Sequence, residues 1–212
     1  MRGSGARFIT LEGGEGAGKS TQLRYLAEHL RGLGIEVVTT REPGGSPGAE
    51  MIRKLLVEGP ADAWDAAAEA LLMFAARRDL LGSTIWPALR QGQWVISDRF
   101  ADSTRAYQGY GHGLALAEIE TLYRLAVGDF APDLTLILDL PVEIGLKRAA
   151  TRSGAETRFE RFGIDFHQRV REGFRQIAAA EPARCVLIDA DAPIDAVRTC
   201  VLQAVNDRLG VG

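Results

Sequence analysis

Five short apolar segments recur along the chain, and each consists mainly of aliphatic and β-branched residues. Within each segment these residues follow one another almost without interruption and do not alternate with polar ones. Such runs are typical of strands that are buried on both faces of a sheet. The pattern therefore predicts five strands, over residues 7–12, 36–41, 94–99, 134–140 and 185–190.

Helical patterns occupy the segments between these strands. Leu23, Leu26 and Leu30 recur at helical spacing, and Pro47 directly after Ser46 is a typical helix start. The predicted helices cover residues 20–34, 46–59, 63–81, 114–128, 142–150 and 193–209. Strands that alternate with helices predict one α/β domain over residues 1–212, with helices on both faces of a five-stranded parallel sheet.

Composition and charge exclude several classes of protein. The 212 residues suit one domain with a sizeable core, and a formal net charge of −3 gives no reason to expect a nucleic-acid or membrane partner. No apolar run approaches the roughly 20 residues that span a bilayer, and the first residues lack the apolar core of a signal peptide. Cys185 and Cys200 have no metal-type neighbours, and we interpret both as reduced thiols in the core of a cytoplasmic protein.

The segment 13–21 carries a strong chemical signal. Gly13, Gly18, Lys19 and Ser20 match the phosphate-binding pattern G-x-x-x-x-G-K-[ST], between a predicted strand and a predicted helix. Glycines let backbone N–H groups turn toward phosphates, and the helix adds the positive end of its dipole. The pattern predicts that Lys19 reaches the β- and γ-phosphates of ATP and that Ser20 binds Mg²⁺. The predicted ATP-binding residues are Gly13, Gly14, Glu15, Gly16, Ala17, Gly18, Lys19, Ser20 and Thr21.

The strand predicted over 94–99 ends in Asp98 and Arg99, at the edge where ligands bind in open α/β sheets. An aspartate there suits Mg²⁺, directly or through water, and the planar guanidinium of Arg99 suits a phosphate. The alternative is an ordinary salt bridge at the surface. Switch GTPases share the phosphate-binding loop, but the guanine-reading Asn-Lys-x-Asp segment that they need is absent.

Three further stretches indicate the acceptor: TREPGG at 40–45, LLMFAARR at 71–78 and DRFADSTRAYQGYG at 98–111. Together with EGGEGAGKST at 12–21, they closely resemble the thymidylate kinases, which phosphorylate dTMP with ATP. The resemblance covers nearly the whole chain in order. It implies a P-loop NTPase fold with a short lid, Mg²⁺ with ATP, dTMP as the acceptor and a homodimer.

The same resemblance implies residues that would hold the thymine base. Phe74 would stack on the ring, and Arg78, four residues later on the same helical face, would reach a base carbonyl. Arg77 lies one position off that face and is not a candidate. Thr104 and Gln108 would hydrogen-bond the base edge. The alternative for Phe74 is packing in the core, the commoner position of a helical phenylalanine.

Other residues would hold the sugar and the monophosphate of dTMP, on the same resemblance. Arg53 and Arg99 would grip the phosphate as a pair, and Glu42 would orient one of them. Tyr107 would crowd the sugar. Glu15 would accept a hydrogen bond from the 3′-hydroxyl group, and the alternative for Glu15 is that it points to solvent.

Residues 151–163 are charged, contain glycine and follow a predicted helix, which is typical either of a surface loop or of a mobile lid. Members of the family need an arginine near the transferring phosphate, some in the phosphate-binding loop and others in the lid. The loop here has no arginine, so the resemblance favours Arg158 in the lid, with Arg152 and Arg161 as alternatives. The implied catalytic residues are Lys19, Arg99 and Arg158.

Two other functions remain open at this point. A kinase for another nucleotide or for a deoxynucleoside is disfavoured by TREPGG and by Phe74 with Arg78. A nucleotide-dependent switch would bind ATP, hydrolyse it slowly and ignore dTMP. The helix expected over 66–81 has more apolar surface than one face needs, which suits either a homodimer or burial within the monomer.

Overall fold

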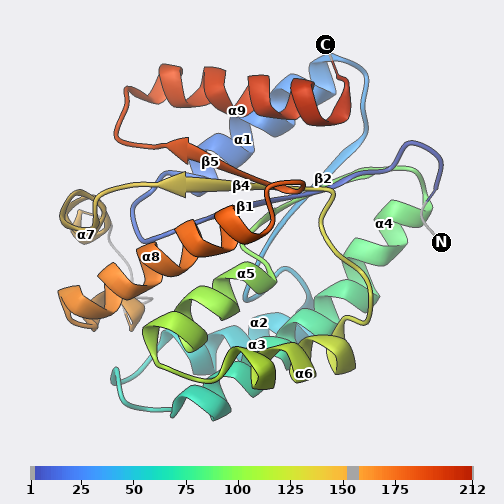
Figure 1. Ribbon diagram of the computed structural model, residues 1–212. Coiled ribbons are helices and arrows are strands. Elements are labelled where there is room, and N and C mark those ends of the chain that lie inside the picture. The colour runs from blue at the N-terminus through green and yellow to red at the C-terminus, as the bar shows by residue number, and fades with distance from the viewer. Residues whose placement is uncertain (1–2, 152–157, 212) are drawn as a thin grey trace.

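A five-stranded parallel sheet lies at the centre of the computed structural model, which describes residues 3–151 and 158–211 (Figure 1). The strands are β1 (Phe8–Gly13), β2 (Val37–Arg41), β3 (Trp94–Asp98), β4 (Leu134–Asp139) and β5 (Cys185–Asp189). Their order is β2-β3-β1-β4-β5, and every neighbouring pair is parallel. The predicted sheet is confirmed, and each strand differs from its predicted range by at most one residue at either end.

The register of the sheet brings the ends of three strands to one edge. Leu11 of β1 lies opposite Asp98, the last residue of β3, and Arg41 at the end of β2 lies opposite the same aspartate. Gly13 at the end of β1 lies opposite Leu138 of β4. The loops that follow β1, β2 and β3 therefore leave the sheet beside one another, at the edge where open α/β sheets bind ligands.

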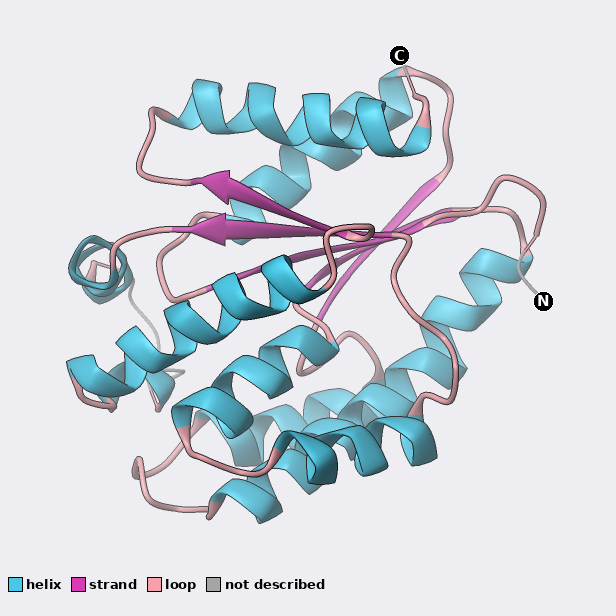
Figure 2. Cartoon of the chain, in the orientation of Figure 1, coloured by secondary structure: helices cyan, strands magenta, loops and turns pink. Residues whose placement is uncertain are grey.

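Helices cover both faces of this sheet, as Figures 1 and 2 show. On one face lie α1 (Lys19–Gly32) and α9 (Ile194–Leu209), which contact each other. Below the other face lie α2 (Pro47–Val57), α3 (Ala66–Leu80), α4 (Trp86–Arg90), α5 (Ala101–Thr104), α6 (Leu116–Ala126) and α8 (Ile164–Ala180). The short helix α7 (Val142–Ala150) lies beyond the end of β4.

Among the helical regions that were not predicted, two pack against each other beside the site. The helix α8 buries Phe166, Val170, Phe174 and Ile177, a spacing of four, four and three residues that the sequence carries openly. The other region is α5 with the π-helical segment Arg105–Gly111 that continues it. Its glycines and polar residues resemble a loop, and burial against α8 makes it helical.

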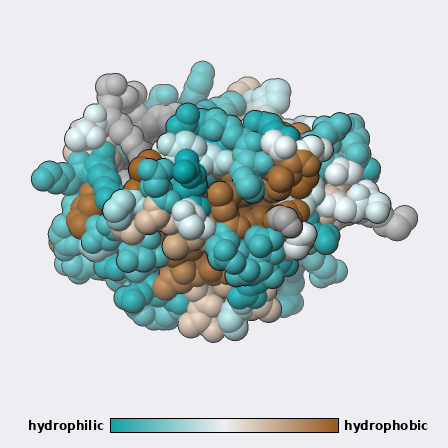
Figure 3. Space-filling model, turned by 90° about the horizontal axis from the view of Figure 1, so that it is seen from above, coloured by the Kyte–Doolittle hydropathy of each residue, from teal (hydrophilic) through white to brown (hydrophobic). Residues whose placement is uncertain are grey.

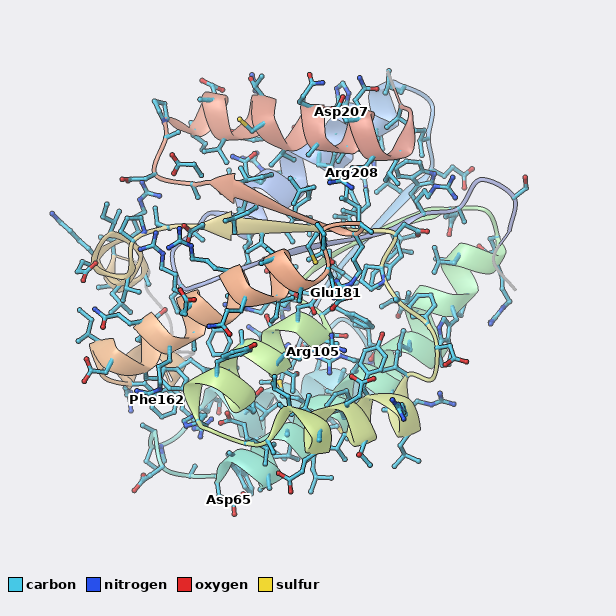
Figure 4. The ribbon with its side chains drawn as sticks, viewed as in Figure 1. Asp65, Arg105, Phe162, Glu181, Asp207 and Arg208 are labelled. Atoms are coloured by element: carbon cyan, nitrogen blue, oxygen red, sulfur yellow. The ribbon has the colours of Figure 1, made fainter. Side chains whose placement is uncertain are left out.

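The helix α3 begins later than predicted, because Asp65 caps it. The Asp65 Oδ1 atom accepts a hydrogen bond from the Ala68 N–H at 2.7 Å, and an aspartate that accepts this bond is a preferred N-cap. Figure 4 labels Asp65 at the start of this helix. The helix then runs through a π-helical segment, Leu81–Ile85, into α4, so Phe74 and Arg78 lie on one continuous helical rod.

The molecular surface and the cysteines bear on two further expectations. Hydrophilic and hydrophobic areas alternate on the face shown in Figure 3, and across residues 3–151 and 158–211 no helix combines the length and apolar character needed to cross a bilayer. Cys185 and Cys200 are both free thiols. Cys185 is buried as expected, but the core position predicted for Cys200 is wrong, because this residue lies off the buried stripe of α9 and is exposed.

Candidate active site

The phosphate-binding loop joins β1 to α1, from Gly13 to Lys19. Gly16 has a φ of 67°, and a Cβ at this position would lie 2.1 Å from the carbonyl oxygen of Gly145. A Cβ on Gly13, where φ is 132°, would lie 2.4 Å from the carbonyl oxygen of Leu138. Both positions therefore require glycine, and the loop packs closely against α7 and β4.

Lys19, the first residue of α1, curls back over this loop. Its Nζ donates hydrogen bonds to the carbonyl oxygens of Gly13 at 3.1 Å and Gly14 at 2.8 Å. Burial lowers the pKa of this ammonium group to about 8, and the neighbouring Arg99 guanidinium acts in the same direction. The carboxylates of Asp98, Glu15 and Glu12 act in the opposite direction. A positive charge beside the start of a helix suits an anionic ligand.

Two oxygen ligands meet at the end of β3. Ser20 Oγ donates a hydrogen bond to Asp98 Oδ2 at 2.6 Å. A hydroxyl and a carboxylate are donors of the kind that Mg²⁺ takes, usually together with water and phosphate oxygens. Within the described part of the chain, no group of three or more His, Cys, Asp or Glu side chains could hold a metal alone. The pair therefore fits a magnesium ion that arrives with a phosphate ligand.

Arg99 follows β3 and connects the loop to the helical side of the site. Its Nη1 donates to Gly13 O and to Ser103 Oγ, both at 3.0 Å. Its Nη2 donates to Glu15 Oε1 at 2.9 Å and to the Tyr107 hydroxyl at 3.0 Å. Burial alone would raise the pKa of Glu15, but Arg99 and the loop lysine outweigh it and lower this pKa to about 2. Glu15 therefore lies inward against Arg99, ionised, and does not point to solvent.

A cavity of about 330 Å³ lies beside these groups, a size that suits a small organic ligand. Among the predicted residues it is lined by Glu15, Gly18, Lys19, Ser20, Glu42, Arg53, Asp98, Arg99, Thr104, Tyr107 and Gln108. Residues that the sequence did not predict also line it: Arg41, Pro43, Val57, Met73, Arg77, Phe100, Ser103, Phe159 and Glu160. The loops after β1, β2 and β3 thus meet α2, α3 and α5 around one cavity.

On α3, the residues that line the cavity are one position away from the predicted base-binding pair. Met73 and Arg77, four residues apart, line the cavity, whereas Phe74 and Arg78 do not. One residue along a helix is a rotation of about 100°, which turns Phe74 into the core against the Tyr123 ring, with centroids 6.4 Å apart. The same rotation places Arg78 on an exposed side of the helix, where it donates a hydrogen bond to the Ala126 carbonyl at 3.1 Å.

Arg77 is the arginine that enters the cavity from α3. It is 1% exposed, and its Nε donates to Glu42 Oε2 at 2.8 Å while its Nη2 donates to Thr104 Oγ1 at 3.1 Å. Its Nη1 and the Oε1 of Gln108 are buried and have no hydrogen-bond partner among the described residues. A buried polar atom without a hydrogen-bond partner costs free energy, so a ligand that bonds to both atoms would gain binding free energy.

Glu42 and Arg53 take partners that differ from the prediction. Glu42 orients Arg77 instead of Arg53 or Arg99, since Arg77 reaches it from α3. Burial raises the pKa of Glu42, although Arg77 opposes this. Arg53 Nη1 donates to the Pro43 carbonyl at 2.5 Å. Arg53 and Arg99 still line the same cavity, as the predicted phosphate-holding pair requires.

Arg158, the arginine predicted beside the transferring phosphate, has a different place in the structure. It is 1% exposed and does not line the cavity. Its Nη1 pairs with Glu69 of α3, and its guanidinium also donates to carbonyl oxygens at the end of α2 and just beyond, those of Leu56, Pro60 and Ala61. The buried carboxylate and these carbonyls hold Arg158 in this place, and its role beside the transferring phosphate stays a prediction.

Of the two alternatives to Arg158, the structure describes only Arg161. Arg161, in the single 3₁₀ turn Phe159–Arg161, is exposed, and its Nη1 donates to the Gly59 carbonyl at 3.4 Å. Arg152 lies outside the described residues. Phe162, labelled in Figure 4, lies just before α8, with its ring centroid 5.7 Å from the Arg158 Cζ. The described end of the predicted lid is thus attached to α2, α3 and α8.

Comparisons with known proteins agree with this geometry. The model of a family described as thymidylate kinase matches residues 11–201. The thymidylate kinase of Caulobacter vibrioides is 56% identical over 204 residues, which cover 96% of this chain and 98% of that protein. The thymidylate kinases of a Bradyrhizobium species and of Rhodopseudomonas palustris are 55% and 57% identical, over 98% and 96% of this chain and 93% and 90% of their own.

Proposed function

The chain belongs to the thymidylate kinase family, and we propose that it transfers the γ-phosphoryl group of ATP to dTMP, giving dTDP and ADP. The observation that carries the proposal is a donor and an acceptor among the unpartnered buried atoms of the cavity that also contains Lys19, Ser20 and Arg99; Glu42 Oε1 is a further unpartnered acceptor there. Arg77 Nη1 is a donor and Gln108 Oε1 is an acceptor. One edge of thymine offers a carbonyl oxygen next to an N–H group, which complements this pair.

Phosphoryl transfer at this site depends on alignment and charge neutralisation. The monophosphate of dTMP has a second pKa of about 6, so one of its oxygens is already a nucleophile at neutral pH. Lys19 on the loop and Arg99 at the end of β3 would neutralise charge that moves during the transfer. Ser20 and Asp98 would hold Mg²⁺, which supplies further positive charge to the phosphates of ATP when it is bound.

The acceptor's sugar and phosphate would lie between the loop and α2. Glu15 Oε1 already accepts hydrogen bonds from Arg99 and from the Tyr107 hydroxyl, the latter at 2.8 Å. We therefore assign the other oxygen of Glu15 to the 3′-hydroxyl group, beside Tyr107. Arg53 and Arg99 reach the cavity from different elements, and we assign the monophosphate to them.

A coupled assay of ADP release across nucleoside monophosphates tests the proposal. Turnover with dTMP should exceed that with dCMP and AMP by at least about 100-fold, because cytosine and adenine would leave the buried donor and acceptor unpaired and are strongly rejected. Equal turnover with dCMP would overturn the proposal. Calorimetry with dTMP alone separates a kinase from an ATP-dependent switch, since the switch would not bind dTMP.

We also propose that the chain acts in the cytoplasm as a homodimer. Its free thiols support a reducing compartment. The helices α2, α3 and α6 lie together on one side of the molecule (Figure 1), and they expose Met51, Leu55, Leu71 and Leu125, which are 70%, 50%, 56% and 82% accessible. Such apolar residues on adjacent helices mark a contact with another protein surface.

Sedimentation should give twice the mass of one chain, and Leu71→Glu on α3, the middle helix of the three, should shift the mass to that of the monomer. The matched control is Leu33→Glu, on an equally large leucine that is 49% exposed at the end of α1. A wild-type monomer at micromolar concentration would refute the homodimer.

A further inference from the structure

Glu69 is a fully buried carboxylate on the cavity side of α3. It is 0% exposed, and it precedes Met73 and Arg77 by four and eight residues, so all three share one stripe of the helix. Glu69 does not line the cavity. Its partners therefore decide whether it contributes only to folding or also to the choice of ligand.

One oxygen of Glu69 faces Gln108, a residue that does line the cavity. Gln108 Nε2 donates a hydrogen bond to Glu69 Oε1 at 2.6 Å. The other oxygen, Oε2, pairs with Arg158. A carboxylate that faces an arginine only accepts hydrogen bonds, so the amide group turned toward it must be the NH₂ group. This contact leaves Gln108 Oε1 as the group available to a ligand, and Oε1 is buried with no partner among the described residues.

We infer that Glu69 is a positioning residue for base selection, because it fixes the Gln108 amide with its oxygen toward the ligand. The inference rests on the proposed function, in which Gln108 meets the base. An acceptor at this position matches the N–H group at position 3 of thymine. Cytosine carries an acceptor at position 3 and an amino donor at position 4, so Gln108 Oε1 and Arg77 Nη1 would both meet the wrong group.

Arg158 supports this arrangement. Its other hydrogen bonds go to the carbonyl oxygens of Leu56, Pro60 and Ala61, so its guanidinium is fixed independently of Glu69. The His112 Nε2 atom lies 3.7 Å from Glu69 Oε1, beyond hydrogen-bond distance. Glu69 therefore has two close side-chain partners among the described residues, one that holds it and one that it orients.

Glu69→Gln tests the inference, because this change should reverse the Gln108 amide. The single carbonyl oxygen of the new side chain would accept from Arg158, leaving its NH₂ group to donate to Gln108 Oε1. Gln108 would then present NH₂ to the ligand, opposite the N–H of thymine. We expect kcat/KM for dTMP to fall about 10- to 100-fold, and the ratio of dTMP to dCMP to narrow by at least tenfold.

Two further variants separate positioning from mere stability. Glu120 lies on α6, away from the cavity, and forms an ion pair with Arg105. Glu120→Gln removes the same charge as Glu69→Gln, and it should leave the ratio of dTMP to dCMP activity unchanged. In a Gln108→Leu background, Glu69→Gln should no longer change this ratio. A narrowing of equal size in that background would show that Glu69 does not act through Gln108.

Loss of one partner from a buried ion pair can prevent folding, so the paired change Glu69→Gln with Arg158→Gln provides a variant without an unpaired charge. It also frees the Gln108 amide, and the same ratio should narrow at least tenfold. A ratio equal to that of the wild type in a folded variant would overturn the inference. Absence of dTMP turnover in the wild type would instead refute the proposed function, so the two failures are distinguishable.

Discussion

Replacing Lys19 by alanine should lower kcat for dTMP phosphorylation by about 10²- to 10³-fold, the loss typical when one preorganised charge is removed from a transition state. Lys19 Nζ lies over the loop, bonded to the carbonyls of Gly13 and Gly14, where the β- and γ-phosphates of ATP would enter. An anionic phosphate is a stronger acceptor than a neutral carbonyl. The ammonium group would therefore turn to the phosphate at little cost.

Lys54→Ala provides the control for this prediction. The sequence has only three lysines, and Lys54 is exposed on α2, so its loss should leave kcat within about twofold of the wild-type value, as for most surface changes. Pre-steady-state measurement of dTDP formation separates the chemical step from product release. An unchanged rate of that step in Lys19→Ala would show that Lys19 contributes to binding alone.

The sheet and the phosphate-binding loop could be predicted because their causes are local. Strands buried on both faces need continuous apolar runs, and each of the five gave such a run. Gly13 and Gly16 lie where a Cβ would collide with backbone carbonyls, so these glycines in the sequence indicate the close packing of the loop. Asp98 and Ser20 followed from their positions at the end of a strand and at the start of a helix.

The orientation of α3 was not predictable in the same way. Residues three and four positions apart both lie near one face of a helix, so Phe74 is compatible with either Arg77 or Arg78. The preceding residue, Met73, decides between them, because the Met73, Arg77 stripe faces the cavity. That stripe is set by packing of Phe74 and Leu80 into the core, and a cluster of this kind joins segments far apart in sequence.

The partners of Arg158 depend still more on the tertiary structure. Its ion pair with Glu69 joins residues 89 positions apart, and its bonds to the end of α2 join residues about 100 apart. The sequence between residues 151 and 163 marks this arginine only as one of three in a charged segment. A glutamate within the apolar first half of α3 is the signal that could have indicated its partner, because a buried charge needs one.

Replacing Arg99 by alanine should have the larger effect, a fall in kcat of about 10³-fold or more, as for arginines that stabilise a transferring phosphoryl group. Arg99 links four groups, Gly13 O, Ser103 Oγ, Glu15 and Tyr107. Its loss removes charge from the transfer step and also releases the carboxylate assigned to the sugar. KM for dTMP should therefore rise together with the fall in kcat, whereas Lys19 and the loop should keep the Kd for ATP within a few-fold.

The backbone at Arg99 makes alanine the appropriate replacement. Its φ is 74°, a left-handed conformation that costs any residue with a Cβ about the same. This conformation is held by the Arg99 N–H bond to Leu11 O at 2.9 Å and by the Ser97 hydroxyl bond to Arg99 O at 2.7 Å. Alanine keeps the backbone cost and both bonds, so the loss in rate reports the guanidinium group.

Arg90 lies at the exposed end of α4, so Arg90→Ala controls for the removal of an arginine as such. It should leave kcat and KM for dTMP unchanged. Arg99→Lys should recover only part of the lost rate, because an ammonium group cannot reproduce the planar fork that spans Gly13 O and Glu15. Full activity in Arg99→Lys would mean that charge alone suffices. A kcat for Arg99→Ala within tenfold of the wild-type value, in a variant with an unchanged melting temperature, would contradict the role assigned to Arg99.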